Sequence, residues 1–245
     1  MVRLFAMPPE NSPDSNLISS PPRTRRKIRV AEKSALLTRA KLIDAALETI
    51  LAVGYYRASS NEIARRAEVS WGAVQHHFGS RERLMYAAFE AACTEVTAVL
   101  KAARVTGDTV EERLLSVQDV VFGFFGKASY VGILQVMWNL TSDPDTSDEL
   151  HGSLRAIVAQ IYDEYVRLML QVSPDASTEF AWFSYMASWG LAVAAASGKV
   201  LRYADDLEES NLLQRRLLSK ALSALLSEST RTAPAGAALI ESSKS

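Results

Sequence analysis

The sequence predicts an all-α fold. Apolar residues recur every three or four positions along most of the 245 residues, which is the spacing of one face of a helix. No segment alternates polar and apolar residues with period two for more than a few positions, as a half-buried strand would. Breaks such as Gly107-Asp108, Asp143-Pro144 and Ser173-Pro174 separate the periodic segments, so we expect helices joined by short turns.

The N-terminal segment, residues 1–34, has a different composition. It is rich in Pro, Ser, Asn and Arg and has no sustained apolar period, so we expect a disordered basic arm. Its basic cluster, residues 23–29, is either a solubilising arm or a flexible contact to the phosphates or minor groove of DNA. No apolar run of adequate length follows the start, so the sequence does not predict a secretory signal.

The next segment, residues 35–82, predicts a domain of three helices. Apolar residues at helical spacing build a first helix that ends at Gly54. Ser60 can cap a short second helix, because its hydroxyl accepts a backbone N–H of the first turn. Residues 68–70 form a turn, and a third helix follows from Trp71. Two short helices joined by a tight turn are typical of a helix-turn-helix, which lays its second helix in the DNA major groove.

The helix from Trp71 to Phe78 has two different faces. At about 100° per residue, Val74 and Phe78 point toward the interior of the domain. The opposite face comprises Gly72, Ala73, Gln75 and His76. The two small residues would let the helix backbone approach the bases, and a glutamine can form paired hydrogen bonds to adenine.

These residues resemble the tetracycline-repressor (TetR) family of bacterial regulators over about residues 36–85. The matching motifs, in order, are Gly54-Tyr55, Ser59-Ser60, Ile63-Ala64, Ala67-Glu68-Val69-Ser70, His77-Phe78 and Ser80-Arg81-Glu82-Arg83-Leu84. Two positions depart from the family pattern, because Glu68 stands at the usual turn glycine and Gln75 at the usual tyrosine. A left-handed Glu68 would cost on the order of 1 kcal/mol, and the operator sequence of relatives cannot be assumed for this chain.

The resemblance also implies which residues face DNA. They are Ser60, Asn61, Trp71, Gly72, Ala73, Gln75, His76, His77 and Arg81. Three of them have an alternative interpretation. Trp71 could pack on the core, His77 could be packed or bonded to a phosphate, and Arg81 could be a solvated residue at a helix start. His76 and His77 are neighbours that point to different faces, so no metal site is expected on this helix.

The remaining chain, residues 83–228, predicts a second helical domain, followed by a disordered tail at 229–245. A long helix from Arg81 to about Ala103 would connect the two domains, with Leu84, Ala88, Ala91, Val99 and Ala103 toward the interior. Further helices are expected at 109–125, 129–140, 147–171, 176–198 and 206–227.

The segment from Phe180 to Gly198 contains 19 residues without a charge. Its length would allow a membrane span, but its many small residues and the lack of a basic flank favour a buried helix instead, and no membrane partner is expected. Gly190, Ala194 and Gly198 recur every four residues and would let another helix pack closely. The resemblance implies that the last two helices form a four-helix bundle with a second subunit, so a homodimer on a near-palindromic operator is expected.

Aromatic and methionine side chains are dense in the second domain. Their default meaning is a core, and the resemblance adds a pocket for an unknown small-molecule effector. The candidate ligand-binding residues are Gln118, Phe122, Phe125, Gln135, Trp138, Asn139, Tyr162, Trp182, Tyr185 and Trp189. Their mixture implies a mainly apolar ligand that carries one or two polar groups.

Composition constrains the function class. Residues 1–85 hold 14 Lys and Arg against 8 Asp and Glu, a balance of +6, whereas the remainder holds 13 against 20, or −7. A basic front fits a polyanionic partner such as double-stranded DNA. The single Cys93 excludes an internal disulfide and fits the cytoplasm.

The resulting hypothesis is a cytoplasmic, ligand-responsive repressor that uses no cofactor or metal. The alternatives are a helix-turn-helix activator or nucleoid-type DNA binder without a ligand, and, more remotely, an all-helical enzyme. The sequence lacks the common hydrolase, metalloprotease and phosphate-loop motifs, which disfavours the enzyme.

Overall fold

The computed structural model describes residues 22–201 and 207–232. The chain divides into two units, residues 1–38 and residues 39–245. The first helix, α1 (Pro22–Val53), runs through the boundary, and every contact discussed below lies within the second unit. All regular structure in the described residues is helical, as the sequence predicts.

The start of α1 differs from the prediction. A disordered arm was expected through residue 34, whereas the helix already begins at Pro22. Proline suits the first turn of a helix because the N–H that it lacks has no partner there. The Arg, Lys, Ala and Glu residues that follow are good helix formers. Most of them are polar, so this part of the helix has no apolar residues at helical spacing by which it could be predicted. The rest of the predicted arm, residues 1–21, lies outside the described residues.

Three helices form the head of the second unit, namely the end of α1, α2 (Ser60–Arg66) and α3 (Trp71–Phe78). Gly54 ends α1 with a φ of +83°, a left-handed conformation that glycine adopts freely. Side chains that are almost fully buried hold the three helices together, and they include Leu42, Ala46, Ile50, Ile63, Ala64 and Val74.

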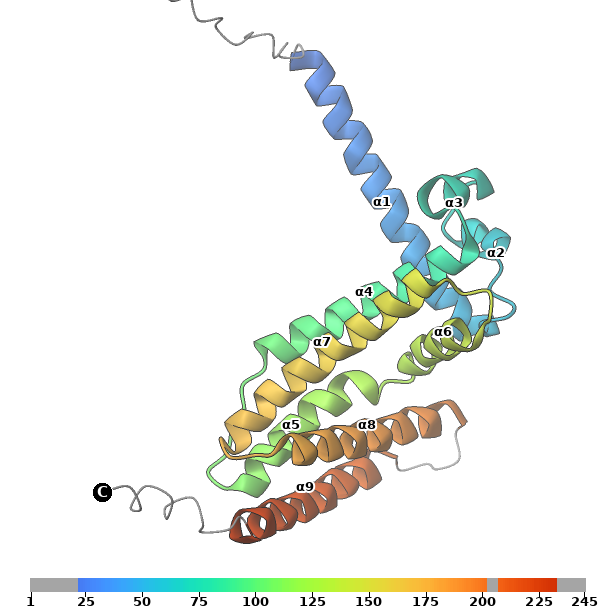
Figure 1. Ribbon diagram of the computed structural model, residues 1–245. Coiled ribbons are helices and arrows are strands. Elements are labelled where there is room, and N and C mark those ends of the chain that lie inside the picture. The colour runs from blue at the N-terminus through green and yellow to red at the C-terminus, as the bar shows by residue number, and fades with distance from the viewer. Residues whose placement is uncertain (1–21, 202–206, 233–245) are drawn as a thin grey trace, which may run out of the picture. The chain divides into compact units, whose positions relative to one another are not determined.

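The other six helices form the body, and Figure 1 shows how they are arranged. They are α4 (Arg81–Ala102), α5 (Val110–Phe125), α6 (Tyr130–Ser142), α7 (Asp148–Val172), α8 (Thr178–Leu201) and α9 (Leu207–Thr232). The long helices α4 and α7 lie side by side, while α8 and α9 pack against α5 and against each other (Figure 1). The expected order of helices is confirmed, with ends shifted by a few residues. The last helix continues to Thr232, beyond the expected start of the tail at residue 229.

The buried side of α4 is rotated from the predicted one. Leu84 and Ala88 are buried as expected, but Ala91 and Val99 are exposed. The inward positions are instead Met85, Phe89, Ala92, Val96 and Leu100. This stripe has the same spacing of three and four residues as the predicted one but is shifted by one position, which is a rotation of about 100° around the helix.

The uncharged stretch of α8, residues 180–198, is not buried on every side. Ser184, Ser188 and Ala192 face the interior, but Phe183, Gly190 and Ala194 are exposed. In residues 22–201 and 207–232, no single helix is long and apolar enough to span a membrane; the bent pair α5 and α6 meets that test jointly, with a 75° bend between them.

Candidate nucleic-acid interface and effector cavity

The turn between α2 and α3 contains a strained residue. Glu68 adopts a φ of +56° and is the one non-glycine residue with positive φ in the described chain. This confirms the left-handed geometry considered for the position where the family pattern has glycine. Ser70 caps α3 by accepting the backbone N–H of Ala73 at 3.3 Å, as predicted. The cap of α2 is Ser59 rather than Ser60, since the Ser59 hydroxyl accepts the N–H of Glu62 at 3.2 Å. Ser60 therefore occupies the first helical position.

The two faces of α3 agree with the sequence analysis. Val74 is fully buried and Phe78 nearly so, while Gly72 and His76 are exposed. Ala73, Gln75 and His77 are half-buried at the sides of the exposed edge. Trp71 is 53% exposed, which favours the outward interpretation over core packing. The outer edge of α3 is therefore open along its length.

Asn61 and Ser60 lie at the start of α2, where Asn61 is exposed and Ser60 half-buried. Farther along the same helix, the Glu62 carboxylate accepts hydrogen bonds from Arg65 and Arg66 at 2.7–2.9 Å. These bonds lower the pKa of Glu62 to about 2. The carboxylate is therefore ionised at neutral pH and holds both guanidinium groups on the surface of α2.

Arg81 has a different environment from the expected one. Its guanidinium donates to the backbone oxygens of Ala58 (3.0 Å) and Tyr55, and lies 4.4 Å from the centre of the Tyr55 ring. These contacts join the start of α4 to the loop between α1 and α2. The side chain thus stabilises the head internally, a role that sequence spacing alone does not reveal because its partners lie more than 20 residues away.

A second link joins the head to the body. The backbone N–H of Tyr55 donates to Oε1 of Gln135 on α6 at 3.1 Å. Nearby, Gly132 of α6 faces Leu51 of α1 so closely that an added Cβ would lie 2.9 Å from the Leu51 side chain. Glycine at this position lets α6 and α1 approach each other. Gln135, predicted to bind ligand, instead fixes α6 to the head.

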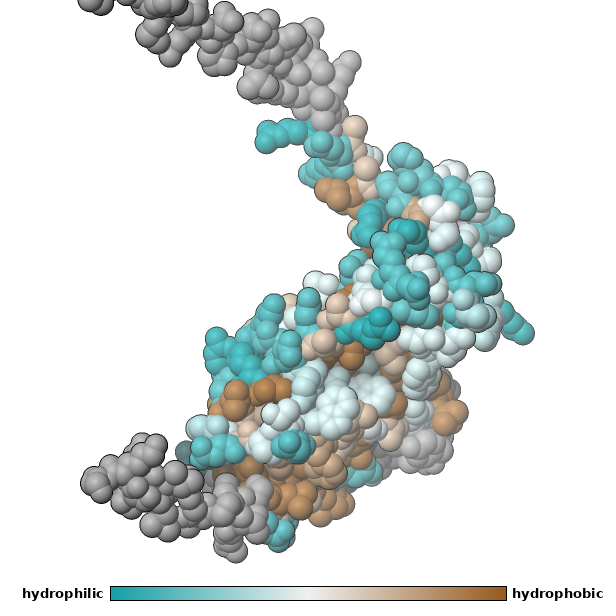
Figure 2. Space-filling model, viewed as in Figure 1, coloured by the Kyte–Doolittle hydropathy of each residue, from teal (hydrophilic) through white to brown (hydrophobic). Residues whose placement is uncertain are grey.

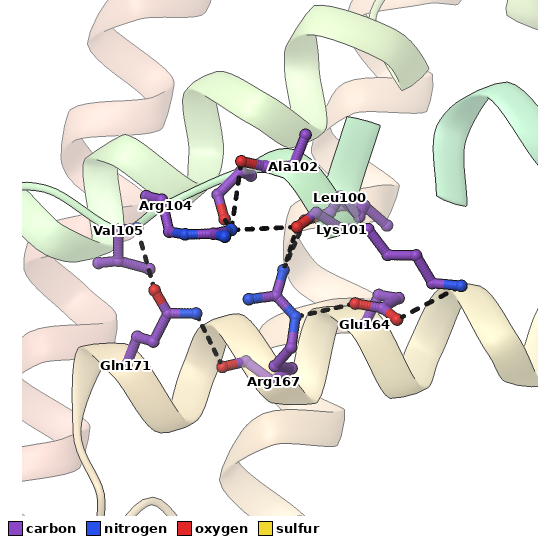
Figure 3. Close-up of polar contacts among 9 residues, drawn as sticks. Leu100, Lys101, Ala102, Arg104, Val105, Glu164, Arg167 and Gln171 are labelled. Carbon is purple, nitrogen blue, oxygen red and sulfur yellow. Dashed lines mark hydrogen bonds and ion pairs between the residues drawn. The ribbon is translucent and has the colours of Figure 1, made fainter. Parts of the chain in front are cut away.

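The far end of α4 is held by cations (Figure 3). Arg167 of α7 donates to the Leu100 carbonyl at 2.6 Å and to the Glu164 carboxylate at 2.8 Å. Arg104 donates to three carbonyls of the last turn, and the Gln171 amide accepts the N–H of Val105. Positive charge at the C-terminal end of a helix is favourable because the last carbonyls carry partial negative charge. One end of α4 is therefore fastened to α7 and the other to the head.

The body contains an apolar cavity of about 620 Å³ between α4, α5, α6, α7 and α8. Its size lies within the usual range for small-molecule sites. The lining residues are Phe89, Cys93, Val96, Phe124, Phe125, Tyr130, Met137, Thr141, His151, Leu154, Arg155, Val158, Ala159, Ile161, Tyr162, Trp182, Tyr185, Met186 and Trp189.

Half of the predicted ligand-binding residues line this cavity. They are Phe125, Tyr162, Trp182, Tyr185 and Trp189. Edge-to-face contacts organise the ring cluster, with centroids 5.3 Å apart for Tyr162 and Trp182 and 5.4 Å apart for Tyr162 and Tyr185.

The other predicted residues lie elsewhere. Gln118 is fully buried between helices, where its amide donates to the Ser188 hydroxyl at 2.7 Å. Phe122 lies beneath the Arg215 guanidinium of α9. Trp138 is 52% exposed outside the cavity, and the Asn139 amide donates to its own helix at the Gln135 carbonyl. The polar residues Gln118 and Asn139 were predicted to face the ligand, but their amides form hydrogen bonds between or within helices instead.

Several cavity residues were missed by the sequence analysis. His151 and Arg155 are the most informative because they place polar groups at an otherwise apolar wall. The available signal was their spacing with Tyr162 on one side of a single helix, since 151, 155, 158, 159 and 162 recur at helical intervals. Burial and the nearby Glu90 raise the pKa of the Cys93 thiol in the same cavity to about 12. Cys93 is therefore a protonated packing residue at neutral pH.

An exposed apolar face covers α8 and α9. On α9 the exposed residues Leu213, Leu217, Ala221 and Leu225 recur every four positions. On α8 they are joined by exposed Phe183, Gly190 and Ala194. Figure 2 shows hydrophobic side chains gathered over this part of the body, while the surface of the head is hydrophilic. Large exposed apolar patches mark interaction sites in soluble proteins.

Comparisons with known proteins agree with this geometry. Residues 42–88 match the family described as bacterial regulatory proteins, tetR family. The chain is 40% identical over 111 residues to the HTH-type transcriptional regulator BetI of Escherichia coli, a match that covers 42% of this chain and 52% of that protein. The chain thus spans about half the length of the curated relatives it matches.

Solved structures extend the likeness to most of the fold. A tetR-family bacterial regulatory protein from Rhodococcus RHA1 superposes with a TM-score of 0.60 at 20% identity, covering 76% of this chain and 96% of that one. FadR of Bacillus subtilis, solved in complex with stearoyl-CoA, superposes with a TM-score of 0.54 at 17% identity over 76% of this chain and 96% of its own. At these identities the comparison establishes the fold.

Proposed function

The chain carries the DNA-binding domain of the tetR family of bacterial regulatory proteins, and from this premise we propose that it is a transcriptional repressor. It binds a near-palindromic operator as a homodimer and is released by a small, mainly apolar ligand. The observation that carries the proposal is the open outer edge of α3. Trp71, Gly72 and His76 are exposed there on a helix whose other side is buried. That arrangement suits a helix lying in a major groove.

DNA contacts divide into two kinds. Gly72 and Ala73 let the backbone approach the bases, and Gln75 can read an adenine from its side of the edge. Ser60, Asn61, Trp71 and His77 surround this edge and contact phosphates, which set the register of the protein on the duplex. Arg81 supports these contacts from behind by holding the loop at Tyr55 and Ala58.

The exposed face of α8 and α9 supports a homodimer. Its leucines are 43–58% exposed in a single chain, and the small side chains of Gly190 and Ala194 allow a second copy of α8 to approach closely. A twofold axis through this face would repeat α3 on the other side of the dimer. Two recognition helices then reach successive major grooves about 34–36 Å apart.

Release by a ligand follows from the two links between the head and the body. α4 is tied to the head by Arg81 and to α7 by Arg167, while α6 is tied to the head by Gln135. Both helices also line the cavity, through Phe89 and Cys93 of α4 and through Met137 and Thr141 of α6. A ligand that fits a different spacing of these helices shifts the population away from the DNA-binding state. A fold relative that holds stearoyl-CoA supports the capacity of such a body for an apolar ligand.

Two alternatives remain distinguishable. An activator or nucleoid-type binder would share the head but would not need the cavity. An enzyme would need an activated group, yet burial raises the pKa values of Cys93, Tyr130 and Tyr185, which keeps these cavity side chains protonated.

Three exposed helical glycines offer a matched experiment. A side chain at Gly72 would meet only the Ser70 hydroxyl at 3.6 Å, and side chains at Gly190 and Gly123 would meet nothing within 4 Å. Each glycine is changed to glutamate, and operator binding is measured by mobility shift in the presence of nonspecific competitor. We expect the Gly72→Glu variant to remain a dimer but to lose DNA binding. We expect the Gly190→Glu variant to become monomeric.

The Gly123→Glu variant on α5 serves as the control for helix content and charge, and it should retain both properties. If wild-type binding disappears with competitor, the protein is a nonspecific binder. If the wild-type protein binds no DNA at low salt, the regulator proposal fails.

A further inference from the structure

The cavity has a polar end and an aromatic end. Among the described residues that line it there is no Asp, Glu or Lys, and Arg155 is the single arginine. Arg155 follows His151 by four residues on α7, so the two side chains lie on the same side of that helix. Thr141, at the end of α6, completes this polar end. The Nε2 atom of His151 on α7 lies 3.2 Å from the carbonyl oxygen of Leu140 on α6. The remaining wall is mainly aromatic and aliphatic.

Among the arginines in the described part of the body, Arg155 is the one that lines the cavity. Arg167 pairs with Glu164, Arg215 with Asp119 and Arg113 with the Val172 carbonyl, whereas Arg155 has no hydrogen bond or ion pair within the described residues. Its helical neighbours three and four positions away are His151, Gly152, Val158 and Ala159. None of them is a carboxylate. Arg155 is exposed, so its guanidinium donors are available at the solvent edge of the apolar cavity.

The nearest acidic residues of α7 do not neutralise this end. Asp148 and Glu149 occupy the first turn of the helix, but neither lines the cavity. The Glu149 carboxylate lies 3.6 Å from Arg83 of α4. The first turn of α7 also directs the positive end of its helix dipole toward this region, which favours an anion.

The other part of the cavity wall is aromatic and offers an anion no cationic partner. Tyr162 lies there against Trp182, about two helical turns along α7 from Arg155. Burial raises the pKa of Tyr162, and the nearby carboxylates Asp163 and Glu179 raise it further. The described residues of this aromatic end supply no cation, so the end beside Arg155 is the favoured position for an anionic group.

We propose that the effector is an apolar monocarboxylate whose carboxylate pairs with Arg155 and whose hydrocarbon body lies among Phe125, Tyr185 and Trp189. This inference rests on the proposed function in one respect, namely that the cavity is the effector site. A guanidinium matches a carboxylate through two parallel hydrogen bonds, which orients the ligand as well as attracting it. Its head then lies beside the end of α6, the helix that holds Tyr55 through Gln135.

The test compares ligands that differ only in the head group. Four tryptophans are present, and two of them, Trp182 and Trp189, line the cavity. Changing Trp71 and Trp138 to Phe leaves fluorescence that reports on the cavity alone. Dodecanoate, dodecan-1-ol and dodecylamine are titrated below their aggregation concentrations, and 2-naphthoate is compared with 2-naphthol as an aromatic pair. We expect each carboxylate to bind about tenfold more tightly than its alcohol, and dodecylamine to bind most weakly.

The Arg155→Met variant should bind each carboxylate no better than its alcohol while the alcohol affinity stays unchanged. Arg57→Met, at an exposed site in the loop between α1 and α2, is the matched control and should retain the preference. Equal affinities in the wild-type protein, a preference that survives Arg155→Met, or no binding by either pair would each overturn the inference. Operator release is measured separately. Release by alcohols and carboxylates alike would leave the proposed function intact, whereas tight carboxylate binding without release would leave the inference intact.

Discussion

Gln135 on α6 accepts a hydrogen bond from the backbone N–H of Tyr55 at 3.1 Å, across 80 positions of sequence. Two and six residues farther along α6, Met137 and Thr141 line the cavity. The same helix therefore meets both the head and the space in which an effector would bind. A coupling between two sites needs such a shared element whose position both can influence.

Removing this hydrogen bond should weaken the link without unfolding the protein. The Gln135→Leu variant leaves the Tyr55 N–H without its acceptor, so we expect the free energy of unfolding to fall by about 1 kcal/mol. Gln135→Glu keeps an acceptor oxygen and serves as the control. Urea titration measures the difference, and a leucine variant as stable as the wild-type protein would show that the contact contributes nothing.

Glu68 offers a stabilising substitution. Its φ of +56° is unfavourable for a residue with a Cβ, and glycine adopts this conformation freely. Glu68→Gly should raise the free energy of unfolding by about 1 kcal/mol. Glu68→Ala removes the same charge but keeps the Cβ, so it should bring no such gain. If the glycine and alanine variants are equally stable in urea, the positive φ at position 68 does not destabilise the protein.

Arg81 should matter for stability more than for phosphate binding. Arg81→Met removes two hydrogen bonds and the contact with the Tyr55 ring, and we expect a loss of about 2 kcal/mol. Urea titration and the salt dependence of operator binding separate the two roles. A phosphate contact would instead leave stability unchanged and reduce the slope of log K against log salt by about one.

Glu62 should contribute to acid sensitivity. Hydrogen bonds from Arg65 and Arg66 lower its folded-state pKa to about 2, below the ordinary value of 4.5. A lowered folded-state pKa gives stability that is present above pH 4.5 and is lost as the pH falls toward 2. Glu62→Gln should therefore flatten the pH dependence of stability in that window, and more so at low salt, because the pair is exposed. An unchanged pH profile would contradict this contribution.

The head could be predicted from the sequence in detail because its signals are local. Ser70, Val74, Phe78 and Gly54 each act within one turn of the chain, and the structure bears out each one. The Ser59 cap shows the limit of such signals, since two adjacent serines offer the same chemistry and only the path of the backbone selects between them.

The cavity could be predicted only in part because its members come from five helices. Aromatic density indicated Trp182, Tyr185 and Trp189, but the facing direction of each polar residue depends on partners distant in sequence. Gln118 donates a hydrogen bond to Ser188, 70 positions away, and Gln135 accepts one from Tyr55, 80 positions away. Arg155 is not among the predicted ligand-binding residues, because no local pattern shows that its side of α7 borders the cavity.

The central claim is that the outer edge of α3 lies against DNA and is repeated by a second subunit. Hydroxyl-radical footprinting of the protein on the DNA upstream of its own gene tests this directly. The account predicts two protected patches on one face of the duplex, related by a twofold axis and about 34–36 Å apart. Saturating protein that protects a single patch, or none at low salt, would contradict it.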